Sequence, residues 1–368
     1  MSPTMSGYLD LCRLAAAIAV FLVHANIFQI GGKLPFIWRL PSIGHDAVIA
    51  FFVLSGFVIA YVTDREHSRL RHYAVARVSR LWSVALPALL LTLVADAIGR
   101  SLSPARYGGA SVFSTDLPVW RFAANLLFLN ELWFSSVRPF SNLPFWSIGF
   151  EFWYYAIFGA WTYLTGRPRH IAVAALCLVA GPKILLLMPV WLMGVVAYRV
   201  SKKDRLKATT SVLLIAASGL AYVLFHYLDL PLKLLALTRE RLGPLAYDLS
   251  WSQTFIHAHI VGVLIALHFL GVASLTRNCR IRFPGVGYLA SFTFALYLCH
   301  YPLLYLLGAL VDHFQIERYR SAFVILGVCF VVAIVGSFTE RLKNGVRRHL
   351  RFVVDRARMA PTPATPAG

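Results

Sequence analysis

The first apolar segment of the chain combines the length of a membrane span with charges that lipid disfavours. Residues 8–26 are long enough to cross a bilayer, yet they include Asp10, Arg13 and His24. Arg13 and His24 are three helical turns apart, so they share one helix face at a separation of roughly 16 Å along the axis. Ionisable groups inside a span usually face a protein interior or a water-filled cavity. The segment therefore predicts a functional site inside a helical bundle.

Both residues also have a purely structural interpretation. Arg13 could extend its side chain to the inner interface, and His24 could be a hydrogen-bonded core histidine. Their shared face favours the functional interpretation.

Composition predicts the fold class. The chain has 368 residues, of which 58% are hydrophobic and only 14% charged, and its mean hydropathy is +0.67. These values are typical of an all-α, polytopic membrane protein and exclude an ordinary soluble domain. The five cysteines are odd in number and their spacing fits neither a disulfide framework nor a zinc site. We interpret them as small buried hydrophobic residues.

We predict about ten transmembrane helices from the apolar segments. The segment at 120–134 is also apolar, but it carries Asn125, Asn130 and Glu131, so we expect it to be re-entrant or interfacial. The fifth and sixth segments are short for full spans and are interrupted by Gly181-Pro182 and Pro189, which favours a tight hairpin of short or tilted helices. The predicted spans are 9–29, 44–63, 81–99, 145–165, 171–186, 187–200, 209–228, 252–274, 287–310 and 320–340.

The net charge of +19 has a topological explanation. With the N-terminus inside, 21 of the 35 lysines and arginines fall in inner loops and 12 in outer loops. This asymmetry predicts that both termini are cytoplasmic, and it removes the need for a nucleic-acid partner. We expect a membrane domain over 1–340 and a basic cytoplasmic tail over 341–368 that is disordered at its end. We expect the first span to be retained.

The second span begins at a polar pair and contains a small-residue pair. Ser55 and Gly56 predict close helix packing, here against the first span. His45 and Asp46 lie at the predicted outer mouth, where they could contact a polar substrate or form a solvated helix start.

A basic pair follows on the cytoplasmic side. If the segment is helical, Arg77 and Arg80 are neighbours at i,i+3 and their like charges repel. An anion relieves that repulsion, and guanidinium groups bind phosphate in a bidentate manner. Contact with lipid headgroups is the alternative.

Two further helix starts carry polar motifs. Ser147 and Glu151 share a face directly after Trp146, and Glu151 has a depth comparable to that of His24. A carboxylate facing an imidazole forms a general-base pair, although a structural ion pair is the alternative. Tyr297 and His300 also share a face, and either substrate contact or polar packing explains them.

Metal and nucleotide signatures are missing from the sequence. His257 and His259 are two residues apart and point to different helix faces, so they chelate poorly. No Gly-rich phosphate loop, nucleophile elbow or paired-histidine zinc motif occurs. We predict no metal site.

Taken in order, these motifs resemble the membrane acyltransferase-3 family, which O-acylates bacterial surface and exported glycans. The resemblance covers residues 8 to 340 and rests on five ordered patterns. They are Arg-x10-His at Arg13 and His24, Phe-Phe-x-Leu-Ser-Gly-Phe at 51–57, Arg-x-x-Arg at Arg77 and Arg80, Trp-Ser-x-x-x-Glu at Trp146, Ser147 and Glu151, and Tyr-Leu-x-His-x-Pro at Tyr297, His300 and Pro302.

The resemblance implies transfer of an acyl group, commonly acetyl, from cytoplasmic acyl-coenzyme A to a sugar hydroxyl. It implies a bacterial inner-membrane protein that contacts lipid and has a polysaccharide or lipid-linked glycan acceptor. Acetyl-coenzyme A is then a co-substrate, and no cofactor is permanently bound. On this basis His24 is the expected general base with Glu151 as its partner. The expected donor-binding residues are Arg13, Arg77 and Arg80, and the expected substrate or supporting residues are Ser55, Trp146, Ser147, Tyr297 and His300.

Two other function classes remain open at this point. A proton-coupled transporter or glycan exporter also uses intramembrane Arg, His and Glu residues, but its usual inverted repeats are not evident here. A non-catalytic scaffold for polysaccharide synthesis leaves the intramembrane charges unexplained.

Overall fold

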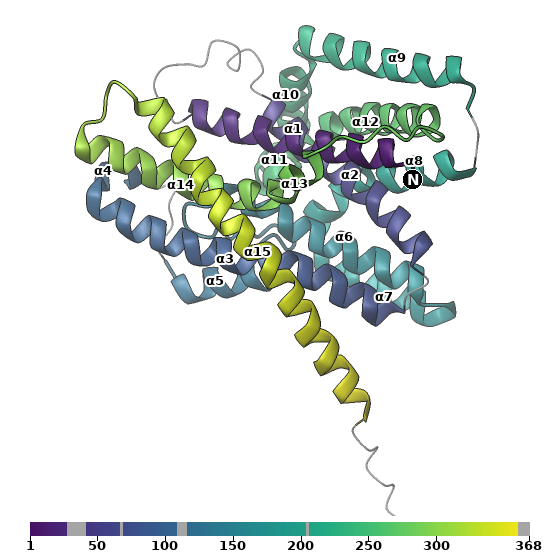
Figure 1. Ribbon diagram of the computed structural model, residues 1–368, viewed down its shortest axis with the longest axis horizontal. Coiled ribbons are helices and arrows are strands. Elements are labelled where there is room, and N and C mark those ends of the chain that lie inside the picture. Colours follow the sequence, from purple (N-terminus) through teal and green to yellow (C-terminus); the bar gives the residue numbers. More distant parts are fainter. Residues whose placement is uncertain (28–41, 67–68, 109–115, 204–205, 360–368) are drawn as a thin grey trace, which may run out of the picture.

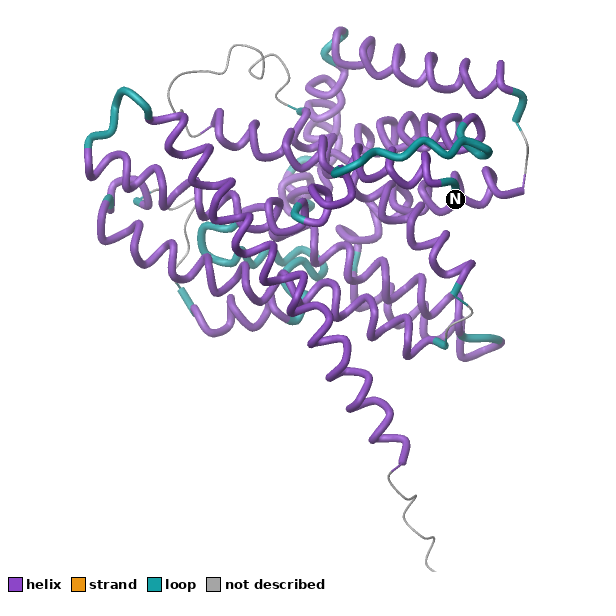
Figure 2. Tube along the Cα trace, viewed as in Figure 1, coloured by secondary structure: helices purple, strands orange, loops and turns teal. Residues whose placement is uncertain are grey.

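The computed structural model describes residues 1–27, 42–66, 69–108, 116–203 and 206–359. Within these ranges the protein is helical and contains no strand, as Figure 2 shows, which confirms the predicted all-α class. The elements are α1 (Pro3–Ile27), α2 (Ile43–Arg65), α3 (Leu70–Leu102), α4 (Pro104–Tyr107), α5 (Pro118–Leu126), η2 (Leu143–Phe145), α6 (Trp146–Tyr163), α7 (Gly166–Ala180), α8 (Pro182–Lys203), α9 (Ala208–Tyr227), α10 (Leu230–Leu242), α11 (Pro244–Asp248), η3 (Ser250–Thr254), α12 (Phe255–Leu275), α13 (Val286–Ser291), α14 (Thr293–Phe314) and α15 (Arg320–Met359).

Eight helical segments of the described chain are long and apolar enough to cross a membrane. They comprise α1, α2, α3, α8, α9, η3 with α12, α14 and α15. The shorter helices α6 and α7, of 18 and 15 residues, occupy the fourth and fifth predicted segments. The described chain is therefore a polytopic helical bundle whose long helices follow the predicted order (Figure 1).

Several helix boundaries differ from the prediction. Helix α3 begins at Leu70 instead of residue 81, so the whole basic segment before the apolar run is helical. The ninth predicted segment is divided, because α13 ends at Ser291 and α14 begins at Thr293. Charged residues flank these apolar runs, and hydropathy alone places a helix end where the apolar run stops.

The turn of the α7–α8 hairpin lies at the first of the two predicted interruptions. The break between the two helices is at Gly181, ahead of the predicted segment boundary at 186–187, and Pro189 lies inside α8. Gly181 has a φ of +78°, a conformation that L side chains rarely adopt, and a Cβ there would overlap the backbone of Trp133. Backbone geometry therefore places the turn at the glycine, while the membrane-type helix accommodates the proline.

The small-residue pair of α2 packs against α8, not against α1 as predicted. A Cβ on Gly56 would overlap the carbonyl oxygen of Trp191, and a Cβ on Gly194 would overlap that of Val53. Glycine at both positions lets the two backbones approach closely. Helix α2 meets α1 elsewhere, where Gly44 packs on Val23.

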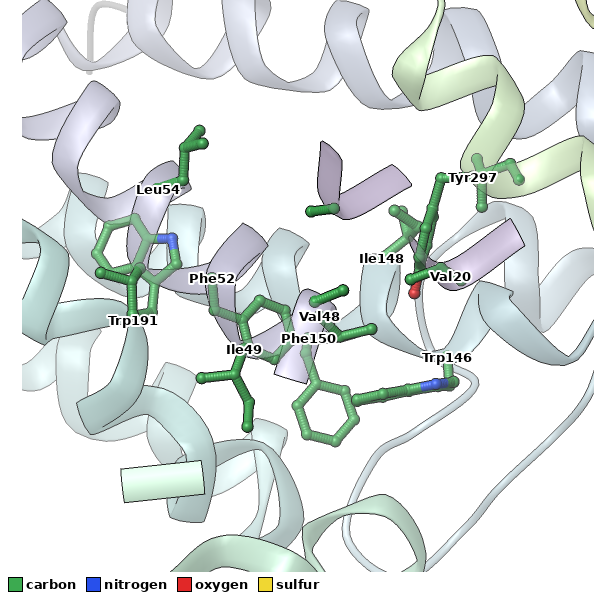
Figure 3. Packing of buried hydrophobic residues seen from close by; sticks show 14 of the residues in the cluster. Val20, Val48, Ile49, Phe52, Leu54, Trp146, Ile148, Phe150, Trp191 and Tyr297 are labelled. Carbon is green, nitrogen blue, oxygen red and sulfur yellow. The ribbon is translucent and has the colours of Figure 1, made fainter. Parts of the chain in front are cut away.

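A cluster of buried aromatic rings holds α2, α6 and α8 together (Figure 3). Phe52 packs edge-on against Tyr154 with ring centroids 5.4 Å apart, and Trp146 packs edge-on against Phe150 at 5.1 Å. Trp191 of α8 is fully buried beside these rings. The cluster fixes the first turns of α6, which carry the predicted site residues of that helix.

The segment after α3 is held to α8 by a buried ion pair. After α5 the chain continues through turns, where Glu131 lies 2.7 Å from the fully buried Nζ of Lys183. Ser136 donates to the same carboxylate at 2.9 Å. The structure shows no continuous helix over 120–134, while the re-entrant or interfacial placement of this segment stays a prediction.

Helix α15 extends past the predicted domain boundary. It crosses α3 obliquely, and its second half projects beyond the other helices in Figure 1. The predicted boundary at residue 340 therefore lies inside a continuous helix. Residues 360–368, where we expected disorder, lie outside the described part of the chain.

Candidate active site

A pocket at the junction of five helices collects most of the predicted site residues. We call it the arginine pocket. Its polar lining residues come from α1 (Arg13), α2 (Ser55), α3 (Arg77, Arg80), α6 (Ser147, Glu151, Tyr155) and α14 (Thr293, Tyr297).

The cations of this pocket have few protein partners. Arg77 and Arg80 occupy one face of α3, as their spacing predicts, and the Nε of Arg77 is buried with no hydrogen-bond partner. The guanidinium group of Arg80 makes no hydrogen bond or ion pair to another described residue. Arg13 pairs with Asp10 at 2.7 Å. Three guanidinium groups thus line the pocket against one lining carboxylate, which suits an anionic ligand.

The carboxylate of Glu151 is oriented by two neighbouring hydroxyl groups. Ser55 Oγ donates to Oε1 at 2.7 Å, and the phenol of Tyr155 donates to the same oxygen. The indole of Trp191 in turn donates to Ser55 Oγ at 3.2 Å. Arg77 lies over the ring of Tyr155, 5.9 Å from its centroid. Glu151 is therefore part of the arginine pocket.

The expected pair of Glu151 and His24 is not formed among the described residues. The imidazole of His24 instead hydrogen-bonds His300, with 2.8 Å between Nδ1 and Nε2, and the two rings stack at 13°. The prediction was wrong on this point because comparable depth along two helices does not ensure that their faces meet. A catalytic role for Glu151 stays a prediction.

The contact with His300 determines which nitrogen of His24 carries the proton. His300 Nδ1 lies 2.8 Å from the carbonyl oxygen of Leu296, which only accepts, so this nitrogen is protonated. In the neutral ring, Nε2 of His300 is then an acceptor, and His24 Nδ1 must donate to it. The lone pair of neutral His24 therefore lies on Nε2. That ring is half-buried, whereas His300 is fully buried.

Tyr297 joins the histidine pair to the arginine pocket. It lines the pocket, and its ring centroid is 6.4 Å from that of His300, one turn further along α14. Its phenol lies 2.7 Å from Ser147 Oγ. The predicted i,i+3 arrangement on α14 and the start of α6 are thus linked directly.

Some site residues have a role that sequence reasoning did not assign. Tyr155 follows Glu151 at i+4, and this spacing was the signal available for it. Tyr301 directly follows His300 and packs edge-on against His24, with centroids 4.9 Å apart. Trp191 had no local signal, because its contact depends on how α8 packs against α2.

The described part of the chain has no metal-binding cluster. No group of three or more His, Cys, Asp or Glu side chains there is arranged to hold a metal ion. All five cysteines are free thiols. The predicted absence of a metal stays a prediction.

Comparison with known proteins gives a family assignment. A family model described as an acyltransferase domain matches residues 6–339, which is nearly the whole membrane-embedded part. No curated protein and no solved structure matches the chain.

Proposed function

The chain belongs to the acyltransferase-3 family and is a multi-pass membrane acyltransferase, and from this premise we propose a specific reaction. The protein transfers an acyl group, most simply acetyl, from cytoplasmic acyl-coenzyme A to a hydroxyl of an exopolysaccharide or other envelope glycan. Its location is the bacterial inner membrane, with both termini cytoplasmic. Acyl-coenzyme A is a co-substrate in this scheme and is not permanently bound.

His24 is the general base of the proposed reaction. Its Nε2 accepts the proton of the acceptor hydroxyl while the hydroxyl oxygen attacks the thioester carbonyl carbon. The tetrahedral intermediate collapses with cleavage of the carbon–sulfur bond, and the protonated imidazole returns its proton to the departing thiolate. The products are the acyl ester and free coenzyme A. His300 keeps Nδ1 of His24 as the donor, so that Nε2 is available for this step.

The arginine pocket binds the donor. Phosphate groups of coenzyme A bind the guanidinium groups of Arg77 and Arg80, because guanidinium groups form charge-assisted bonds with phosphate. On the predicted topology this pocket lies in the cytoplasmic half of the bundle. Tyr297 separates it from the histidine pair, so a thioester carried past this ring meets His24.

The observation that carries the proposal is the single available lone pair of His24 beside a cationic pocket. Its test is His24→Gln in purified protein, with release of free coenzyme A measured in the presence of acceptor glycan. We expect the rate to fall by roughly 10² to 10⁴, as for loss of a general base. His170→Gln, a matched change at an exposed histidine of α7, should keep the wild-type rate.

The cell provides a second readout. Complementing a deletion strain with His24→Gln should leave its envelope glycans without the acyl ester, although the variant protein inserts into the membrane normally. Wild-type acyl content with His24→Gln would falsify the assignment of the base.

A further inference from the structure

A second cavity lies at the outer ends of α2, α9 and α12 and takes no part in the steps above. We call it the outer cavity. It is lined by side chains of α2, α9, α10, η3 and α12, among them His45, His226, Leu235, Trp251, Gln253 and His257.

The wall of the outer cavity is fixed by one buried carboxylate. Asp46 is 4% exposed and accepts hydrogen bonds from His257 Nε2 at 2.6 Å and Tyr222 Oη at 2.9 Å. His226 Nε2 lies 2.9 Å from the same carboxylate without hydrogen-bond geometry. The imidazole of His257 therefore carries a proton on Nε2. A network satisfied in this way holds its side chains in one geometry.

This network leaves hydrogen-bonding atoms available to a ligand. His257 is 3% exposed and its Nδ1 has no partner among the described residues. Thr254 donates to the carbonyl oxygen of Trp251 at 3.1 Å, so His45 Nε2 donates to Thr254 at 2.8 Å and leaves His45 Nδ1 as an acceptor. Two ring nitrogens thus present lone pairs at fixed positions, and their rings are 5.5 Å apart.

The charge of the cavity excludes an anionic ligand. Among the described residues that line it there is no lysine or arginine, and the lining carboxylate is Asp229. Trp251 adds an aromatic surface that is immobilised by stacking on Trp146, with centroids 5.0 Å apart and an interplanar angle of 9°. An aromatic surface beside a few positioned polar groups suits a neutral, polyhydroxylated ligand.

The position of the cavity connects it to both parts of the site. Trp146, which backs Trp251, directly precedes Ser147 of the arginine pocket. Gly44, next to His45, packs on Val23, next to His24. The cavity therefore lies at the level of the proposed base, on the predicted outer side of the donor.

We propose that the outer cavity binds a saccharide unit of the acyl acceptor, with hydroxyl groups donating to His257 Nδ1 and His45 Nδ1 and the sugar ring lying against Trp251. The identity of the ligand as acceptor rests on the proposed function. The saccharide site itself depends only on the cavity.

Cysteine protection tests the site without requiring turnover. Leu235→Cys places a thiol in the lining of the cavity, and Leu237→Cys places one on the same helix at a residue that is 40% exposed and does not line it. The full-length detergent-purified variants are alkylated with a maleimide while methyl glycosides of glucose, galactose, mannose and N-acetylglucosamine are titrated. Mass spectrometry reads alkylation at each engineered residue.

In Leu235→Cys we expect at least one glycoside, at ten times its dissociation constant, to slow alkylation about tenfold, because only that fraction of sites remains unoccupied. The alkylation rate of Leu237→Cys should not change. Equal alkylation rates with and without every glycoside at position 235 would overturn the saccharide site. The same result at both positions indicates a general effect of sugar and also counts against it.

A cavity-filling variant separates this inference from the proposed function. Leu235→Trp should raise the acceptor KM at least tenfold, because the larger side chain fills the cavity. Hydrolysis of acyl-coenzyme A without acceptor should continue. Leu237→Trp is its matched control. Protection without any coenzyme A release would retain the saccharide site and refute the enzyme, whereas unchanged acceptor KM in Leu235→Trp would refute the site and retain the enzyme.

Discussion

The arginine pocket and the outer cavity are both built from polar side chains inside an apolar bundle. They differ in whether the charged side chains have partners within the protein. In the arginine pocket, Arg77 has a buried donor without a partner and Arg80 has no ion pair among the described residues. Beside the outer cavity, the carboxylate of Asp46 accepts hydrogen bonds from two donors on two other helices, His257 and Tyr222. The first pocket needs a charged ligand to complete it, whereas the second is complete without one.

This difference indicates how one bundle accommodates two unlike substrates. A buried pocket whose cations lack counter-charges attracts anions, and leaving it empty costs free energy. It therefore suits a phosphate-bearing donor. A neutral cavity with fixed lone pairs selects by hydrogen-bond geometry and shape. The histidine pair of α1 and α14 belongs to neither cavity lining and lies next to the arginine pocket through Tyr297.

The largest expected effect concerns His300, the hydrogen-bond partner of the proposed base. His300→Leu removes the acceptor that holds His24 Nδ1, so Nδ1 and Nε2 compete for the proton and we expect kcat for acyl transfer to fall about 100-fold. His300→Gln supplies an amide oxygen for the same bond and should recover most of that loss. Rates and their pH profiles for both variants provide the measurement. Equal losses in the two would contradict the positioning role of His300.

The next effect would show whether the charge of the arginine pocket serves the donor alone. Arg80→Gln removes a charge-assisted bond worth about 1.5–3 kcal/mol, which corresponds to a rise of roughly 10- to 100-fold in the dissociation constant for coenzyme A. Arg100→Gln, at an exposed position of the same helix, should leave it unchanged. Calorimetric titration of coenzyme A into detergent-purified protein measures both. An unaltered affinity in Arg80→Gln would remove the donor role of this residue.

The smallest effect on donor binding is expected from the outer cavity. Asp46→Asn keeps the shape of the side chain but places an amide group against the donors of His257 and Tyr222, so we expect unfolding to become easier by about 1–3 kcal/mol. Coenzyme A affinity should not change, because Asp46 does not line the arginine pocket. Thermal unfolding in detergent and the same titration give both values. A loss of donor affinity as large as that of Arg80→Gln would break the distinction between the two regions.

Much of the fold and part of the site were predictable from local pattern. Arg77 and Arg80 share a face because the helical period requires it, and the same holds for Ser147 with Glu151 and for Tyr297 with His300. Apolar runs located the long helices. The Gly-Pro pair at 181–182 located the hairpin turn. Other helix ends were less predictable, since hydropathy does not report that α3 already begins at Leu70.

The pairing of faces between helices was not predictable. The sequence suggested Glu151 as the partner of His24 on the basis of depth, and only the rotation of α1 against α14 brings His300 to it instead. Gly56 equally offered a close approach to either neighbour, and the contact with α8 was chosen by packing of Trp191 and Val195. Asp46 and His257 are separated by 211 residues, and no local pattern relates them.

The sequence by itself determined the class of the protein, the order of its long helices and the residues that carry charge into the bundle, because hydropathy and helical period act over a few neighbouring residues. The tertiary structure decided which of those residues meet. It joined His24 to His300, placed Glu151 among the arginines and closed the cavity around Asp46, because helix rotation and close backbone contact are properties of the packed bundle as a whole.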